Sequence, residues 1–187
     1  MPRIITGTAR GIHLETNQHE LMRPTTDRLK EAVFSSLQGK MASGNLNSFL
    51  DLFAGCGQIG LEAKSRGVEN VVLVEQNRQA VSTIKRNISK TGLNVQLLPY
   101  NVKRALRKLS NEDRQFDIIY FDPPWQELND LWWEEEFNIY DVLHDDGLVM
   151  IEHAKKIVPA VNPQLWSVVK HKNYGQNTLL VLEQKGV

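Results

Sequence analysis

From residue 48 to the end of the chain, short apolar segments alternate with amphipathic ones, and this alternation restricts the fold more than any other sequence feature. Strands are expected near residues 48–53, 71–74, 95–98, 116–121 and 148–152, with helices near residues 59–66, 79–91 and 102–109. Such alternation predicts a doubly wound α/β sheet with helices on both faces. Two late segments, residues 166–170 and 178–183, lack a helix between them and are expected to close the sheet as an antiparallel pair.

The first 47 residues follow a different pattern. The segments Ile4-Ile5-Thr6 and Ile12-His13-Leu14 flank a glycine-containing turn, which predicts a β-hairpin with a loose turn. A helix is expected over residues 26–37, because apolar side chains recur there at helical spacing after an Arg23-Pro24-Thr25 entry signal. A polar break at residues 39–48 follows. We therefore expect an N-terminal extension (residues 1–47) and an α/β domain (residues 48–187).

A glycine-rich turn follows the first strand of the α/β domain. Gly55, Gly57 and Gly60 form a Gly-x-Gly-x-x-Gly pattern between strand and helix, where the backbone turns tightly and approaches a ligand closely. Glu75 ends the next strand, where a carboxylate accepts hydrogen bonds from both ribose hydroxyls of a nucleoside. The glycines alone are a weak signal, but their register with Glu75 indicates a nucleoside cofactor.

Asp51 in this turn favours one kind of nucleoside cofactor. A carboxylate there suits a ligand that carries an ammonium group, such as S-adenosylmethionine, and repels the pyrophosphate of NAD. We therefore expect S-adenosylmethionine, with Asp51, Phe53, Gly55, Gly57 and Glu75 among its contacts.

A second motif, Asp122-Pro123-Pro124-Trp125, directly follows the strand at residues 116–121. Two consecutive prolines fix the backbone and cannot continue a strand, so they predict a rigid loop. The Asp122 carboxylate and the Pro123 carbonyl can each accept one N–H of an exocyclic amino group, which aims the nitrogen lone pair at a methyl donor. The flat face of Trp125 suits stacking against an extruded base. This chemistry requires no metal.

The two motifs resemble those of class I S-adenosylmethionine-dependent methyltransferases that act on amino nitrogens, whose second motif reads Asp/Asn-Pro-Pro-aromatic. The whole chain is similar to a narrower group, the bacterial family that methylates N2 of one guanine in 16S ribosomal RNA. Four further stretches carry this resemblance: Arg3 to Gly7 with Ala9-Arg10-Gly11, Arg23 to Arg28, Glu62 to Gly67, and Tyr174-Gly175.

The resemblance implies a Rossmann-like class I fold. This fold has a seven-stranded, mostly parallel sheet with an antiparallel closing strand, here preceded by the N-terminal β-hairpin and helix. The resemblance also implies that residues 122–125 hold the target guanine. Arg3, Arg10 and Arg23 are expected to contact RNA, and the expected partner is 16S rRNA in the 30S subunit or its assembly intermediate.

Two positions depart from the family pattern. Where these enzymes usually place an acidic residue against the adenine, this chain has Asn101, whose amide oxygen is the expected substitute. The aromatic residue of the second motif is Trp125, where Tyr is more usual, so stacking is retained and a phenol hydroxyl is absent.

The charge distribution permits an RNA partner although the net charge is zero. Between residues 76 and 111 the chain holds basic residues and no acidic one: Arg78, Lys85, Arg86, Lys90, Lys103, Arg104, Arg107 and Lys108. Such asymmetry is compatible with a positive face, and equally with solvated helix surfaces. A single cysteine, no apolar run of about 20 residues and no secretory signal lead us to expect a cytoplasmic protein without a membrane segment. We also expect a monomer.

Other functions remain open at the level of sequence. The same chemistry would serve another amino acceptor, such as adenine N6 of DNA or a protein glutamine. A Rossmann oxidoreductase would bind NAD but leaves the Asp122 motif unexplained. A non-catalytic RNA-binding or assembly factor would not need the motif intact.

Overall fold

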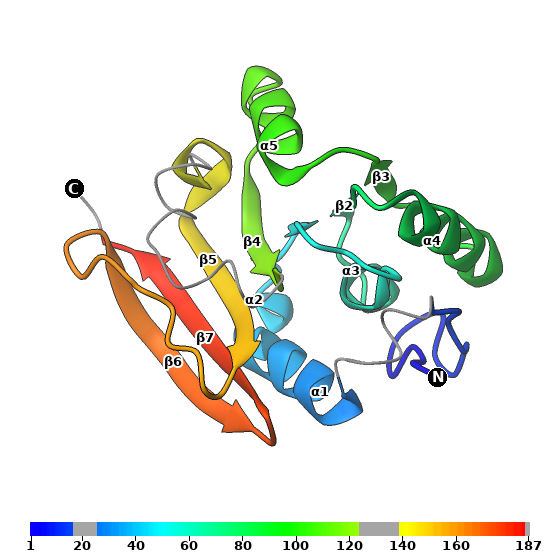
Figure 1. The fold of residues 1–187 in the computed structure, drawn as a ribbon, viewed down its shortest axis with the longest axis horizontal. Helices are drawn as coiled ribbons and strands as arrows, with labels where there is room; N and C mark the ends of the chain where they lie inside the picture. The colour runs from blue at the N-terminus through cyan, green and yellow to red at the C-terminus, as the bar shows by residue number, and fades with distance from the viewer. Residues whose placement is uncertain (17–25, 124–138, 186–187) are drawn as a thin grey trace.

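The computed structural model describes residues 1–16, 26–123 and 139–185. A seven-stranded sheet with strand order β3-β2-β1-β4-β5-β7-β6 forms its centre (Figure 1). The strands are β1 (Ser48–Asp51), β2 (Asn70–Val74), β3 (Gln96–Leu98), β4 (Phe116–Phe121), β5 (Leu143–Ala154), β6 (Trp166–Tyr174) and β7 (Asn177–Gln184). The helices are α1 (Asp27–Ser36), α2 (Gln38–Ala42), α3 (Gln58–Ser65), α4 (Arg78–Thr91), α5 (Val102–Asn111) and the 3-10 turn η3 (Ile139–Val142).

The sheet has a parallel part and an antiparallel part. Strands β1 to β5 pair in parallel, and β7 lies antiparallel between β5 and β6. The central strands β1, β2 and β4 are mainly apolar, and nearly all of their side chains are buried, as expected for strands covered on both faces. The predicted doubly wound sheet with an antiparallel closing pair is confirmed.

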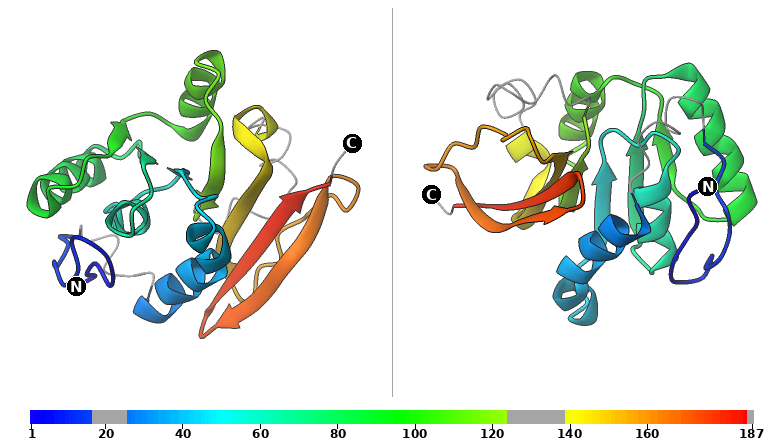
Figure 2. Two further views of the ribbon diagram at one scale, coloured as in Figure 1. Left: turned by 180° about the vertical axis from the view of Figure 1, so that it is seen from behind. Right: turned by 60° about the horizontal axis from the view of Figure 1, so that its bottom comes forward.

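Helices cover both faces of the sheet (Figure 2). On one face, side chains of α1, α3 and α4 pack against the sheet around Phe49, Tyr120 and Met150. On the other face, α5 and η3 pack around Leu50, Ile119 and Val149. None of the helices within the described ranges is long and apolar enough to cross a bilayer.

Three local predictions differ from the structure. The segment expected as a polar break contains the short helix α2, whose Met41 packs against the core. Strand β5 begins at Leu143, five residues earlier than expected. The N-terminal hairpin is reduced to a looped segment, residues 1–16, with one antiparallel bridge between Arg3 and His13. Its two arms are joined by backbone bonds from Ile4 N to Ile12 O (3.0 Å) and from Leu14 N to Pro2 O (2.8 Å), while residues 5, 6, 8 and 9 donate to α3.

Buried polar side chains of α3 fix this N-terminal segment. The fully buried Glu62 carboxylate accepts backbone N–H bonds from Ile5 (2.7 Å) and Thr6 (3.0 Å). Ser65 Oγ accepts from Ala9 N (3.0 Å) and donates to Thr6 O (2.6 Å). The segment thus satisfies its hydrogen bonds against helix α3 as a strand would against a neighbour.

Two further buried residues extend the attachment. Asn87 of α4 accepts from Glu15 N (2.8 Å) and donates to Glu15 O (3.0 Å) and Cys56 O (2.9 Å), so it joins the segment to the glycine-rich turn. Lys30 of α1 donates from Nζ to Arg3 O (2.6 Å), and burial lowers its pKa. The N-terminal segment is therefore packed against α1, α3 and α4.

Candidate active site

Four of the predicted site residues lie at the carboxyl ends of four neighbouring strands. Asp51 ends β1, Glu75 follows β2, Asn101 follows β3, and Asp122 follows β4. Since β3, β2, β1 and β4 are adjacent and parallel, these residues share one edge of the sheet. Ligands of open α/β sheets bind at this edge.

The glycine-rich turn brings backbone amides to this edge. Gly57 caps α3 with φ +84°, a conformation that disfavours side chains with a Cβ. A Cβ at Gly60 would lie 2.0 Å from Leu73 Cδ2, so glycine is required where α3 crosses β2. The turn therefore has the close helix–strand packing expected of a cofactor loop.

Glu75 is held by the turn that it faces. Its Oε2 accepts from Gly55 N (2.9 Å), and its Oε1 accepts from Asn77 N (2.7 Å). A carboxylate has about four lone-pair positions, so these two bonds leave acceptor capacity on both oxygens. Glu75 thus fixes the loop while keeping the ability to accept a pair of hydroxyls.

Phe53 and Asn101 border the same edge. Phe53 is partly buried and makes an edge-to-face contact with Phe121, with ring centroids 5.1 Å apart. Asn101 is exposed and caps α5, where its Oδ1 accepts from Arg104 N (2.9 Å). If Asn101 Oδ1 also accepts a hydrogen bond from the adenine, as predicted, it does so while it caps α5.

The second motif is described only in part. Asp122 is partly buried and Pro123 is buried, both immediately beyond β4. Pro124 and Trp125 lie outside the described residues, as does Arg23. The structure therefore places the carboxylate end of the motif next to the end of β1, where Asp51 pairs with Tyr120 in the sheet register.

A buried polar network below Asp122 was not anticipated from sequence. Tyr120 Oη donates to Glu152 Oε2 (2.5 Å), and Asn177 Nδ2 donates to Glu152 Oε1 (2.6 Å). Burial, and then the nearby carboxylates, raise the pKa of Tyr120 well above its ordinary value, so the phenol remains a donor. In the sequence, the one sign of this network is that Glu152 ends an otherwise apolar strand segment.

Asp51 lies fully buried at the centre of the edge. Its Oδ2 accepts from Gly60 N (3.1 Å). Burial raises the pKa of Asp51 from 3.8 to about 7, although backbone hydrogen bonds from Gly60 and Phe53 oppose this shift. A buried carboxylate with so high a pKa gains from a cationic partner.

We expect Asp51→Asn to stabilise the ligand-free protein at pH 8. Between pH 4 and pH 7 the folded state retains a proton that the unfolded state releases, so the Asp51 contribution to stability falls as pH rises through this window. Over this window the free energy of unfolding loses about 4 kcal/mol because of Asp51. Urea unfolding of both proteins at pH 4, 6 and 8 should give a variant advantage that grows with pH. An advantage independent of pH would contradict the raised pKa.

The arginines and lysines predicted to contact RNA differ in exposure and in their ion pairs. Arg10 is exposed on the N-terminal segment, and Arg3 Nε lies 3.4 Å from Asp27 Oδ2. The basic residues between 78 and 108 are divided between α4 and α5, which cover opposite faces of the sheet. Arg86 is paired with Glu15. These residues therefore do not form one continuous positive face.

Among the residues that the structure describes, no group of three or more His, Cys, Asp and Glu side chains is arranged to hold a metal ion. The site as described consists of carboxylates, backbone amides and aromatic rings, which suit an organic cofactor.

Comparisons with known proteins place the chain among related sequences and structures. Residues 2–183 match the family described as "Conserved hypothetical protein 95". Ribosomal RNA small subunit methyltransferase D of Escherichia coli K12 is 32% identical over 180 residues, covering 93% of this chain and 85% of that protein. The Haemophilus influenzae protein of the same name is 29% identical, covering 92% and 89%. A solved structure of a hypothetical protein from a Thermus thermophilus strain superposes with a TM-score of 0.83 at 30% identity, covering 98% and 99%.

Proposed function

This chain belongs to the conserved hypothetical protein 95 family, and on that premise we propose that it is an S-adenosylmethionine-dependent methyltransferase that methylates N2 of a guanine in 16S rRNA. The observation that carries the proposal is the meeting of Asp51, Glu75 and the Asp122-Pro123 pair at one sheet edge. Relatives named ribosomal RNA small subunit methyltransferase D support an rRNA substrate. The choice of guanine N2 comes from the resemblance of the whole chain to the guanine-N2 family, because the Asp122 motif by itself suits any amino nitrogen.

The residues at the edge fit the cofactor by their chemistry. Asp51 offers a buried negative charge for the ammonium group, and Glu75 offers carboxylate oxygens for the ribose hydroxyls. Phe53 and Asn101 belong to the same sheet edge, and we assign them to the adenine ring. S-adenosylmethionine supplies an electrophilic methyl group on a positively charged sulfur.

The Asp122 motif prepares the acceptor. An exocyclic amino nitrogen is a weak nucleophile because its lone pair is delocalised into the ring. The Asp122 carboxylate and the Pro123 carbonyl each accept a hydrogen bond from one of its two N–H groups. These bonds hold the nitrogen pyramidal and direct its lone pair at the methyl group. Fixing this geometry removes much of the entropic barrier to transfer.

The decisive experiment uses methyl-labelled S-adenosylmethionine and 30S subunits from cells that lack the endogenous enzyme. The RNA is digested and the labelled nucleoside identified by mass spectrometry, with duplex DNA and protein acceptors assayed beside it. We expect N2-methylguanosine with the wild type and none with Asp122→Ala. Label found in adenine of DNA or in a protein glutamine would instead identify that acceptor as the substrate and contradict the proposed one.

We expect Glu75→Gln to weaken cofactor binding by about tenfold or more. A hydrogen bond to a charged group contributes about 1.5–3 kcal/mol, and the amide loses the charge and one acceptor. Titration calorimetry with S-adenosylmethionine measures the effect. Glu69→Gln, at an exposed carboxylate next to the amino end of β2, is the matched control. If Glu75→Gln bound S-adenosylmethionine with the affinity of the wild type, Glu75 would not be a cofactor contact.

We expect Trp125→Ala to lower kcat/KM at least about tenfold while cofactor affinity is retained. Stacking on one base contributes about 1–3 kcal/mol, and about 1.4 kcal/mol is a factor of ten. Trp125→Tyr keeps a stacking face and should retain most of the activity. Unchanged turnover in Trp125→Ala would exclude the stacking role.

A further inference from the structure

Three exposed lysines lie at the carboxyl ends of β5 and β6, at the same sheet edge as the proposed active site. Lys155 and Lys156 directly follow β5, and both are exposed. The Lys155 N–H donates to Gln176 O (2.8 Å), which ties this segment to the turn between β6 and β7. Lys172, also exposed, lies near the end of β6, with Nζ 5.8 Å from the centroid of the Tyr174 ring. We refer to Lys155, Lys156 and Lys172 as the β5–β6 lysine cluster.

The sheet register places this cluster near Asp122. Phe121 pairs with Ile151, so Asp122 is level with Glu152 of the neighbouring strand. Lys155 comes three residues after Glu152, on the order of 10 Å further along at about 3.3 Å per residue. The cluster therefore lies at the same edge as the acceptor site, on the side away from β1, β2 and β3.

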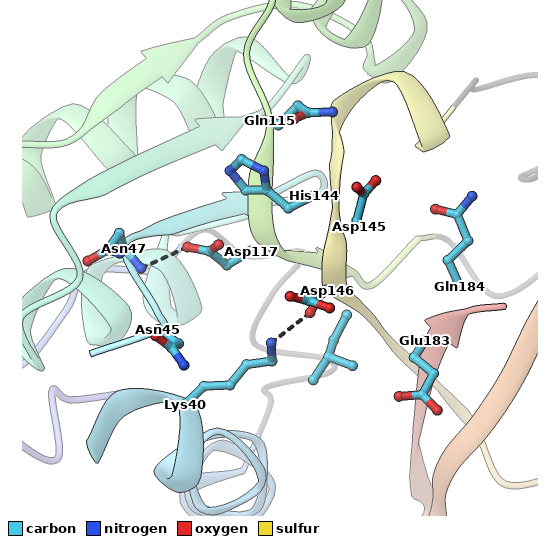
Figure 3. Close-up of a pocket in the computed structure, with 11 residues that line it drawn as sticks. Lys40, Asn45, Asn47, Gln115, Asp117, His144, Asp145, Asp146, Glu183 and Gln184 are labelled. Atoms are coloured by element: carbon cyan, nitrogen blue, oxygen red, sulfur yellow. Dashed lines mark hydrogen bonds between the residues drawn. The ribbon is translucent and has the colours of Figure 1, made fainter. Parts of the chain in front are cut away.

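The opposite end of the same strands is acidic. A groove at the amino ends of β4 and β5 is lined by Asp117, Asp145, Asp146 and Glu183, with Lys40 donating to Asp146 O (2.6 Å) (Figure 3). Among its described residues, the unit β5–β7–β6 thus has exposed lysines at one end, and at the other end three carboxylates with the single lysine Lys185. A polyanion is attracted to the first end and repelled from the second.

We infer that the β5–β6 lysine cluster binds phosphates of the RNA that flank the target nucleotide. The inference rests on the proposed RNA substrate and assigns it a second contact surface. Helix α1 links the N-terminal segment to β6: Asp27 at its amino end lies 3.4 Å from Arg3, and Ser36 at its carboxyl end accepts from Lys170 Nζ (2.6 Å). RNA would then be held by the N-terminal segment and by the lysine cluster, with the target base directed to Asp122.

The test compares two double variants of equal charge change. Lys155→Ala/Lys156→Ala removes two lysines of the cluster and keeps the Lys155 backbone bond. Lys64→Ala/Lys185→Ala removes two lysines next to the amino end of β2 and the far end of β7. Binding to 30S subunits is measured by sedimentation across a salt series without cofactor, and methylation is measured separately.

We expect the cluster variant to bind 30S subunits roughly tenfold more weakly, with a salt slope smaller by about 1.4, or about 0.7 for each lost phosphate contact. KM for 30S should rise while kcat and cofactor affinity stay unchanged, and the control variant should match the wild type. A salt slope and affinity equal to wild type in the cluster variant would overturn the inference. A wild type that binds 30S but methylates no RNA would instead contradict the proposed function, because the binding series judges the cluster independently.

Discussion

Asp122→Ala is expected to reduce kcat for RNA methylation by about 100-fold or more, with cofactor affinity unchanged. Removal of one preorganised polar contact at a reacting centre commonly costs a factor of about 100 to 1,000. Asp122 follows β4 directly, and the neighbouring Tyr120 is fixed through Glu152, so the carboxylate is presented from a rigid strand end. Single-turnover kinetics on 30S subunits isolate the chemical step.

Two comparisons make this result specific. Asp145→Asn removes an exposed carboxylate at the opposite edge and should leave kcat unchanged. Full turnover by Asp122→Ala would exclude the motif from the chemistry. An assembly defect rescued by Asp122→Ala would favour the alternative of a non-catalytic assembly factor.

Glu62→Ala is expected to lower the free energy of unfolding by about 3–5 kcal/mol. The substitution leaves the N–H groups of Ile5 and Thr6 without their acceptor and removes the partner of Arg66, whose Nε donates to Glu62 Oε1 (2.7 Å). Loss of one partner of a buried, hydrogen-bonded charge is costly because the other groups remain desolvated. Urea unfolding gives the free energy, and hydrogen exchange of the Ile5 and Thr6 amides reports the detachment.

The control is Glu112→Ala, whose carboxylate pairs with Lys108 on the surface and contributes little. If the N-terminal segment contacts RNA, Glu62→Ala should also raise KM for 30S subunits while cofactor affinity is retained. Unchanged protection of Ile5 and Thr6 in Glu62→Ala would contradict the anchoring role.

The sequence alone predicted the features that depend on short segments of chain. Hydrophobic alternation located the seven strands, and the motifs located Asp51, Glu75 and Asp122 at strand ends. Parallel strands in a doubly wound sheet bring such ends to one edge, so local signals also predicted that these residues meet. The division of the chain at residue 47, and the roles of Trp125 and Arg23, stay predictions.

Only the tertiary structure decided contacts between segments that are distant in sequence. Glu62 and Asn87 read as ordinary helix residues until the N-terminal segment, 56 to 72 positions away, packs on them. The basic run at residues 78–108, continuous in sequence, is split between α4 and α5 on opposite faces. The lysines after β5 and near the end of β6 share one edge because β7 is antiparallel to both strands, and Lys155 N donates to Gln176 O in the β6–β7 turn. Such pairings depend on strand order, which local hydrophobic periodicity does not encode.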